Sequence, residues 1–123
     1  MKKLLIIDDT AEYAEALRNV LRNEYEVVLA HSLAEAQQAA DDTVSLFLVD
    51  IRLDEADPDN TDGLDFLDWA KTRYKDKPVV VMSAFKEFEE RKDTITSRGA
   101  SAFLKKPIDT VNLRQTLARL AAD

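Results

Sequence analysis

Residues 45–50 read SLFLVD, an apolar run that ends abruptly in an aspartate. A short, continuously apolar run is typical of a strand buried on both faces, as in a parallel sheet covered by helices. A carboxylate at the inner end of such a strand is costly to bury unless a cation or hydrogen-bond donors face it. The run therefore predicts a parallel sheet, and it marks Asp50 as a residue that needs a partner.

Apolar runs and helical patterns alternate along the whole chain. Ser32 and Glu35 form a capping-box pattern at the start of the second helix. Five strand-then-helix units predict one doubly wound α/β domain over residues 1–123. We expect strands at residues 3–7, 25–30, 45–49, 78–82 and 100–104. We expect helices at residues 11–23, 32–40, 63–74 and 87–98, and a last helix capped by Asp109.

Composition narrows the classes of function. The chain has 123 residues, no cysteine and a single histidine, His31, which excludes thiol chemistry, disulfides and multi-histidine metal sites. Its net charge of −7 argues against direct binding of nucleic acid. No apolar run approaches the roughly twenty residues of a membrane span, and the opening apolar stretch is too short for a signal peptide. We therefore expect a cytoplasmic protein that does not enter a membrane.

Polar residues stand at the carboxyl ends of four predicted strands. In a parallel sheet these ends meet at one edge, where ligands bind in doubly wound folds. Three close carboxylates repel one another, so either some of them are protonated or a cation neutralises them. Oxygen ligands without imidazole or thiolate favour Mg²⁺ as that cation. A serine and a lysine opposite them suit phosphoryl oxygens, so the constellation points to phosphoryl transfer onto an aspartate. The residues are Asp8 and Asp9 after the first strand, Asp50 after the third, Ser83 after the fourth, and Lys105 and Lys106 after the fifth.

Four motifs in this order resemble the receiver domain of two-component response regulators. The resemblance covers essentially the whole chain, and its weight comes from the order and spacing of the motifs. It implies a flavodoxin-like (βα)5 fold with a five-stranded parallel sheet in the order 2-1-3-4-5. The motifs are LLIIDD (residues 4–9), LFLVDIRL (46–53), VVVMSA (79–84) and AFLKKP (102–107).

The resemblance implies a role for each residue at the strand ends. Asp50 would accept the phosphoryl group. Asp9 would bind Mg²⁺ directly, Asp8 would bind it through water, and the backbone carbonyl of Arg52 would be a further ligand. Ser83 would form a hydrogen bond with a phosphoryl oxygen and would move on activation.

Residues 103–107 complete the implied site. Lys106 would pair with the phosphoryl group, whereas Lys105 matches a position without a catalytic role. Phe103 would be the aromatic residue that turns inward when Ser83 moves. The bond between Lys106 and Pro107 is expected to be cis.

The resemblance also implies partners. A histidine kinase or a histidine phosphotransfer protein would supply the phosphoryl group. The face formed by the predicted helix at residues 87–98, the strand at residues 100–104 and the last helix would then change its affinity for a target that the sequence does not name. A homodimer could form through the same face. Such a domain catalyses its own phosphorylation and dephosphorylation but is not usually classed as an enzyme. The chain is either a stand-alone receiver or one excised from a longer protein.

The segment after Asp50 departs from the family pattern. Gly63 lies further along the chain than the resemblance implies, and the extra residues 54–60, DEADPDN, are acidic. They could tune access to the phosphoryl group or bind a partner, although a tolerated surface insertion is the simpler interpretation. Arg52 and Phe85 occupy positions that in this family influence the lifetime of the phosphoryl group.

Other functions compete with phosphorylation switching. A receiver-like interaction module that no longer cycles phosphate would be expected to lack Asp9, Asp50 or Lys106, and the chain retains all three. A phosphohydrolase of the haloacid dehalogenase type needs an aspartate two positions after its nucleophile, where this chain has Arg52. A dinucleotide-binding fold is excluded, because the chain has only 2 glycines and no G-x-G-x-x-G motif.

Structural roles compete with some of the functional ones. Asp8 or Asp9 could cap the first helix, with Glu12 as the partner residue. Phe103 could be an ordinary core residue. We expect His31 to be a surface residue, because it lies between a strand and a helix cap.

Overall fold

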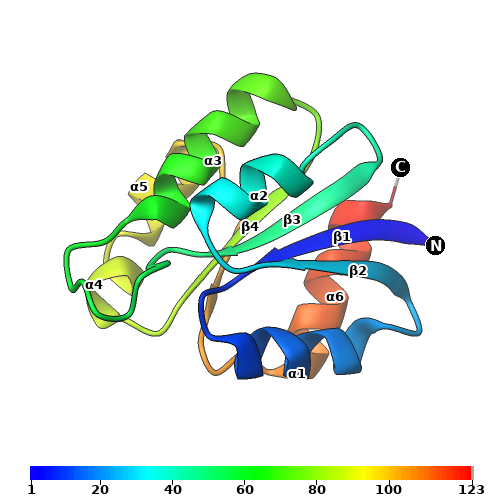
Figure 1. The fold of residues 1–123 in the computed structure, drawn as a ribbon, viewed down its shortest axis with the longest axis horizontal. Coiled ribbons are helices and arrows are strands. Elements are labelled where there is room, and N and C mark those ends of the chain that lie inside the picture. The colour runs from blue at the N-terminus through cyan, green and yellow to red at the C-terminus, as the bar shows by residue number, and fades with distance from the viewer. Residues whose placement is uncertain (123) are drawn as a thin grey trace.

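The computed structural model describes residues 1–122, which form a five-stranded parallel sheet in the order β2-β1-β3-β4-β5 (Figure 1). The order confirms the predicted doubly wound fold. All four strand pairings are parallel. The strands are β1 (Lys2–Ile7), β2 (Tyr25–Ala30), β3 (Val44–Asp50), β4 (Val79–Ser83) and β5 (Ala102–Lys105).

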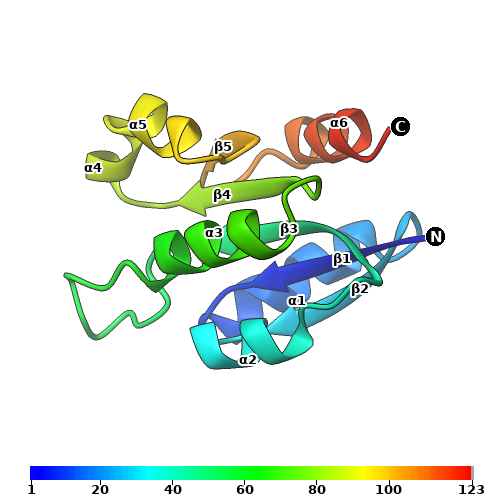
Figure 2. The same ribbon diagram turned by 90° about the horizontal axis from the view of Figure 1, so that it is seen from above.

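Helices cover both faces of the sheet (Figure 1 and Figure 2). α1 (Ala11–Leu21) and α6 (Thr110–Ala121) pack against one face. The other face is covered by α2 (Leu33–Ala39), α3 (Asp62–Arg73), α4 (Lys86–Glu89) and α5 (Lys92–Ser97). None of the helices within residues 1–122 is both long enough and apolar enough to cross a membrane.

The central strands are buried on both faces because successive side chains point into two separate apolar cores. Leu5 of β1 contributes to the core under α2 and α3, whereas its neighbour Leu4 contributes to the core under α1 and α6. In β3, Phe47 packs edge-on against Phe66 of α3, with ring centroids 5.4 Å apart. Burying such apolar surface is worth about 25 cal/mol per Å², and it holds the strand ends rigidly in register.

The predicted helix over residues 87–98 is wrong in one respect, because the structure divides this segment into α4 and α5. The break lies at Arg91, which has φ −104° and ψ 15° and donates its N–H to the carbonyl of Phe88. Phe88 and Ile95 are the buried side chains of the two helices, and residues 90–94 between them are exposed. The middle of the segment therefore lacks an apolar side chain that would hold a continuous helix against the sheet.

Side chains cap the starts of two helices. Ser32 Oγ accepts a hydrogen bond of 3.1 Å from the N–H of Glu35 at the start of α2, as the capping pattern predicted. The Glu35 carboxylate accepts in turn from the backbone N–H of His31 at 3.3 Å. At the start of α6, Asp109 Oδ1 accepts from the N–H of Val111 at 2.9 Å.

Candidate functional site

The parallel register brings the polar strand ends to one edge of the sheet. The pairing of β1 with β3 runs to Ile7, and it places Asp8 level with Asp50. The pairing of β4 with β5 runs to Ser83, so that Lys106 follows β5 at the same edge. The residues predicted from the strand ends are thus brought together by backbone hydrogen bonding in the sheet.

Three carboxylates form a cluster at this edge. One oxygen from each of Asp8, Asp9 and Asp50 lies within 4.8 Å of the others. Asp8 and Asp50 are buried, and Asp9 is half-buried. Lys106 faces the cluster, because its Nζ lies 2.9 Å from Asp8 Oδ2 and 3.3 Å from Asp50 Oδ2.

The cluster is short of positive charge. Burial raises the pKa of Asp50 to about 7; Lys106 opposes this shift, and the Asp8 and Asp9 carboxylates add to it. Burial lowers the pKa of Lys106, but the neighbouring Asp50 and Asp8 carboxylates outweigh burial and leave that pKa raised. Lys106 is therefore an ammonium at neutral pH. A further cation beside Asp50 would favour its charged form and lower its pKa.

Unpaired oxygens in the cluster fit a divalent cation. Asp9 Oδ1 and Asp50 Oδ1 are buried side-chain oxygens that accept no hydrogen bond from the described residues. Such oxygens are rare in folded proteins, because the loss of hydration is costly without a partner. Hard oxygen donors without imidazole or thiolate suit Mg²⁺. Asp8, Asp9 and Asp50 could therefore hold this ion together.

Neither aspartate of the first pair caps α1. The N-cap residue of α1 is Thr10, and its own side chain makes no capping hydrogen bond. Asp8 Oδ1 accepts from the N–H of Thr10 at 2.8 Å, which fixes the turn that leads into the helix. Asp9 Oδ2 accepts from the backbone N–H of Glu55 at 2.9 Å. Backbone donors thus hold both carboxylates at the cluster.

Ser83 and Phe103 lie on the two strands that follow β3 in the sheet. Ser83 is buried at the end of β4, and its Oγ accepts from the N–H of Phe85 at 3.0 Å. Phe103 of β5 is half-buried and packs against the core under α2 and α3. Its side chain is therefore already partly inside the protein.

Lys105, the last residue of β5, and Lys106, which follows it, have different surroundings. Lys105 is exposed and forms an ion pair of 3.2 Å with Glu89 of α4, away from the carboxylates. Lys106 points into the cluster with a side chain that is 10% exposed. The bond between Lys106 and Pro107 is cis.

The loop between β3 and α3 projects beyond the carboxyl ends of the strands (Figure 2). It contacts the cluster through the hydrogen bond from the N–H of Glu55 to Asp9 Oδ2. Asn60 holds its base, since Asn60 Oδ1 accepts from the N–H of Leu53 at 2.9 Å and from the N–H of Asp62 at 3.0 Å. The acidic insertion at residues 54–60 is therefore attached to the site at one end and to the start of α3 at the other.

Arg52 joins this loop to the loop that follows β4. Its Nη2 donates to the carbonyl of Pro58 at 3.0 Å and lies 3.8 Å from Glu87 Oε1. The Cζ of Arg52 lies 3.6 Å from the centre of the Phe85 ring. The Arg52 side chain is only 11% exposed, so this stack is largely shielded from water.

Gly63 allows α3 to begin against the backbone of Asp50. Its N–H donates to the carbonyl of Ile51 at 2.8 Å. A Cβ at this position would overlap the carbonyl oxygen of Asp50. The second residue of α3 must therefore lack a side chain for Asp50 to keep its place.

Two residues near the site were not identified from the sequence. His31, which we expected to be a surface residue, is half-buried, and its Nδ1 lies 2.9 Å from the backbone carbonyl of Asp8. His31 directly follows β2, and the rule of reading residues at strand ends could have found it. Tyr13 of α1 lies beside Lys106, and no local sequence pattern indicates that contact.

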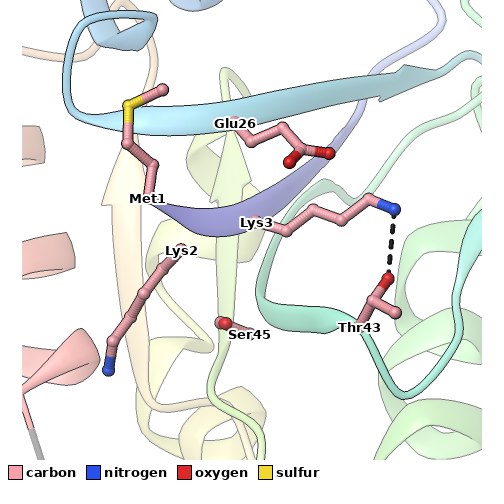
Figure 3. Close-up of a pocket in the computed structure, with 6 residues that line it drawn as sticks. All are labelled: Met1, Lys2, Lys3, Glu26, Thr43 and Ser45. Atoms are coloured by element: carbon pink, nitrogen blue, oxygen red, sulfur yellow. Dashed lines mark hydrogen bonds between the residues drawn. The ribbon is translucent and has the colours of Figure 1, made fainter.

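A separate hollow of about 600 Å³ lies at the opposite end of the sheet, around the first residues of β1 (Figure 3). Figure 3 shows a hydrogen bond of 3.1 Å between two of the residues that line the hollow, from Lys3 Nζ to Thr43 Oγ1. Ligands of doubly wound folds bind at the carboxyl ends of the strands, so this hollow is not the candidate site. It is lined by Met1, Lys2, Lys3, Glu26, Thr43 and Ser45.

Comparison with known proteins gives a consistent assignment. Residues 4–118 match the family described as response regulator receiver domain. The transcriptional regulatory protein ZraR of Escherichia coli strain K12 is 31% identical over 121 residues, which are 97% of this chain and 26% of ZraR. The transcriptional regulatory protein CpxR of the same organism is 28% identical over 123 residues, which are 99% of this chain and 49% of CpxR.

Solved structures agree with these relatives. The receiver domain of NtrX from Brucella abortus has a TM-score of 0.83 and 26% identity, over 96% of this chain and 97% of that one. A receiver domain protein from Methanospirillum hungatei has a TM-score of 0.84 and 23% identity, over 98% of this chain and 94% of that one, and supports the fold alone. The chain thus spans about a quarter of ZraR and about half of CpxR.

Proposed function

Because the chain belongs to the response regulator receiver domain family, we propose that it is a phosphorylation-switched signalling domain in which Asp50 accepts a phosphoryl group. The donor is a histidine kinase or a histidine phosphotransfer protein. The observation that carries the proposal is the state of Asp50: one carboxylate oxygen is held by Lys106, and the other is buried and accepts no hydrogen bond from residues 1–122.

Asp50 is the nucleophile of the proposed reaction. An oxygen of its carboxylate forms a bond to phosphorus, and the phosphorus–nitrogen bond of the donor phosphohistidine breaks. The electron pair of that bond stays on the imidazole nitrogen of the donor, which is then protonated from solvent. The product is an aspartyl phosphate on β3 and a neutral histidine on the donor.

Charge is the main obstacle to this reaction, because a phosphoryl group brings negative oxygens to three carboxylates. Asp9, Asp50 and the carbonyl of Arg52 would hold Mg²⁺, with Asp8 acting through water, and the ion would neutralise part of this charge. Lys106 supplies a positive charge from the chain itself, and its Nζ already lies 3.3 Å from Asp50 Oδ2. Lys106 can turn from the carboxylates to a phosphoryl oxygen without leaving the cluster.

Ser83 and Phe103 convert the new phosphoryl group into a change of surface. In the unphosphorylated chain Ser83 Oγ accepts from the N–H of Phe85, and it gives up this contact to donate to a phosphoryl oxygen. When Ser83 moves, it leaves space beside it, and Phe103, which is only half-buried, turns further inward. The face made of α4, α5, β5 and α6 is the output surface, through which the domain binds a target or a second copy of itself.

Phosphorylation with a small donor tests the proposal. The protein is incubated with Mg²⁺ and acetyl phosphate, and its intact mass is measured. We expect one phosphoryl adduct that is labile in base, requires Mg²⁺ and is absent in Asp50→Asn. Asp76→Asn is the control, because Asp76 is exposed in the turn before β4 and should leave the adduct unchanged. Absence of an adduct, together with no spectroscopic response to beryllofluoride, would favour an interaction module that does not cycle phosphate.

A further inference from the structure

We propose that Tyr13 is a positioning residue for Lys106: the face of its ring holds the ammonium at the carboxylates, and its hydroxyl anchors the backbone that follows. This inference rests on the proposed function, since it gives Tyr13 a part in the reaction at Asp50. Tyr13 itself touches none of the reacting atoms.

Tyr13 meets the segment after β5 at two separate points. Lys106 Nζ lies 4.4 Å from the centre of the Tyr13 ring. The backbone N–H of Ile108 donates to the Tyr13 hydroxyl oxygen at 3.0 Å, across 95 residues of sequence. One side chain of α1 therefore contacts both the head group of Lys106 and the chain two residues beyond it.

The ring contact places an attractive but uncharged neighbour beside the ammonium. Lys106 Nζ already contacts Asp8 and Asp50, and its side chain is 10% exposed, so little water is available to it. The face of an aromatic ring attracts a cation within about 6 Å and gains strength when water is excluded. A third carboxylate here would compete for the charge of Lys106, whereas the ring leaves that charge available for phosphoryl oxygens.

The hydroxyl contact fixes the direction of the chain after Lys106. Residues 106–109 belong to neither β5 nor α6, and Pro107 has no N–H to donate. The N–H of Lys106 is bound to the carbonyl of Ser83 at 2.9 Å, which holds the start of this segment. The Tyr13 hydroxyl holds Ile108 at the other side, so the Lys106 backbone is fixed on both sides.

The fold explains why Tyr13 can reach this segment. α1 begins directly after the acidic pair and packs on the same face of the sheet as α6. Tyr13 lies in the first turn of α1, is half-buried and packs against the core under both helices. A residue at this position faces the connection from β5 to α6.

Two substitutions at Tyr13 separate the ring from the hydroxyl. Tyr13→Leu removes both contacts and keeps an apolar side chain, and Tyr13→Phe keeps the ring and removes only the hydroxyl. Tyr74 offers a matched control, because its hydroxyl donates to the carbonyl of Ala40 at 3.2 Å and Lys77 Nζ lies 4.9 Å from its ring centre. Tyr74→Leu and Tyr74→Phe therefore remove the same two kinds of contact from the end of α3, away from the carboxylates.

Initial rates of phosphorylation by acetyl phosphate, measured over a range of Mg²⁺ concentrations, report the function of Lys106. We expect Tyr13→Leu to lower the rate at saturating Mg²⁺ about 5- to 30-fold, the factor that corresponds to about 1–2 kcal/mol of cation–π attraction. The Mg²⁺ concentration for half-maximal rate should stay unchanged, and Tyr13→Phe should recover most of the rate. Rates for Tyr13→Leu equal to those for Tyr74→Leu would overturn the proposal, as would an effect that lies wholly in the Mg²⁺ requirement.

NMR spectra of the same proteins without a phosphodonor test the contacts independently of the reaction. The ε-methylene protons of Lys106 should shift downfield in Tyr13→Leu, because the ring current is lost, and should keep their position in Tyr13→Phe. The amide proton of Ile108 should shift in both variants. If the wild-type protein accepts no phosphoryl group, the proposed function fails, and these signals alone decide whether Tyr13 holds Lys106. In either case, unshifted Lys106 and Ile108 signals in Tyr13→Leu overturn the inference. If Tyr13→Leu does not fold, an unshifted Ile108 signal in Tyr13→Phe overturns it.

Discussion

The backbone N–H of Glu55 donates a hydrogen bond of 2.9 Å to Asp9 Oδ2. It connects the acidic loop insertion to one of the three clustered carboxylates. The other oxygen of this carboxylate, Asp9 Oδ1, is buried, accepts no hydrogen bond within the described part of the chain and is available to a cation. The insertion therefore orients a proposed metal ligand, in addition to extending the loop beyond the strands.

Removing this N–H should weaken metal binding. In Glu55→Pro the donor is lost, the Asp9 carboxylate can rotate, and we expect the Kd for Mg²⁺ to rise roughly 2- to 10-fold, the factor for an ordinary net hydrogen bond of about 0.5–1.5 kcal/mol. Titration calorimetry measures this Kd. Ala56→Pro is the control, because the N–H of Ala56 donates to Asp54 Oδ1 within the loop at 3.0 Å. Equal effects of the two prolines would show that loop conformation, and not the bond to Asp9, controls the affinity.

The pKa of Asp50 should make the stability of the metal-free protein depend on pH. This pKa is about 7 in the folded protein, against an ordinary value of 3.8, so between these values the folded state keeps a proton that the unfolded chain has lost. The free energy of unfolding should therefore fall as pH rises from about 4 to about 7, by at most about 4 kcal/mol. Below about pH 4 the Asp50 carboxyl is protonated in both the folded and the unfolded state, and its contribution to the free energy of unfolding is fully present.

Urea denaturation in the presence of a chelator measures this pH dependence. Asp50→Asn has no carboxyl proton at this position, so its free energy of unfolding should lack the fall that we assign to Asp50. Mg²⁺ should reduce the difference between the two proteins near neutral pH, because a bound cation stabilises the charged carboxylate. Parallel pH profiles for the wild type and Asp50→Asn would show that Asp50 titrates at its ordinary value.

The stack of Arg52 on Phe85 should contribute to stability. Arg52→Ala removes a guanidinium that lies 3.6 Å from the ring centre and a hydrogen bond to the carbonyl of Pro58, so we expect the free energy of unfolding to fall by about 1–2 kcal/mol. Arg73→Ala is the control, because its guanidinium lies 5.5 Å from the ring centre of Trp69 and should change the stability by less than about 0.5 kcal/mol. A similar loss in both variants, measured by urea unfolding, would contradict a special role for the Arg52 stack.

Gly63 should tolerate no side chain. In Gly63→Ala the new Cβ would overlap the Asp50 carbonyl oxygen, and we expect α3 or β3 to shift at a cost of about 3 kcal/mol or more. Gly99→Ala is a comparison at a position where φ is 117° and the nearest atoms belong to the flexible side chain of Lys71, so its cost should be about 1–2 kcal/mol. Thermal or urea unfolding measures both. A smaller loss for Gly63→Ala than for Gly99→Ala would show that the backbone of Asp50 moves easily.

The sheet and its cluster of polar residues could be predicted from the sequence because both depend on local patterns. Apolar runs indicate the strands, and a parallel sheet places Asp8, Asp50 and Lys106 at one edge without any knowledge of loops. The strand order, in contrast, was expected only from the resemblance to receiver domains. The register brings the two residues to the same edge, where Lys106 Nζ lies 3.3 Å from Asp50 Oδ2. The acidic cluster of Asp8, Asp9 and Asp50 could likewise be expected from residue types at the strand ends.

Contacts between distant segments could not be predicted in this way. The bond from Glu55 to Asp9 depends on the path of an irregular loop, and periodicity carries no information about such a path. The contact between Tyr13 and Lys106 depends on how α1 packs beside the segment after β5. The break at Arg91 between α4 and α5 was missed because a charged segment with sparse apolar residues has a helical pattern whether or not the helix is continuous.

Acceptance of the phosphoryl group by Asp50 is tested by identifying the residue that is phosphorylated. The protein is treated with Mg²⁺ and acetyl phosphate and then reduced with borohydride, which converts an aspartyl phosphate to homoserine, and the digest is sequenced by tandem mass spectrometry. We predict homoserine in place of Asp50 and of no other aspartate, and only when Mg²⁺ is present. Homoserine in place of Asp8, Asp9 or a loop aspartate, with Asp50 unmodified, would contradict the proposed function.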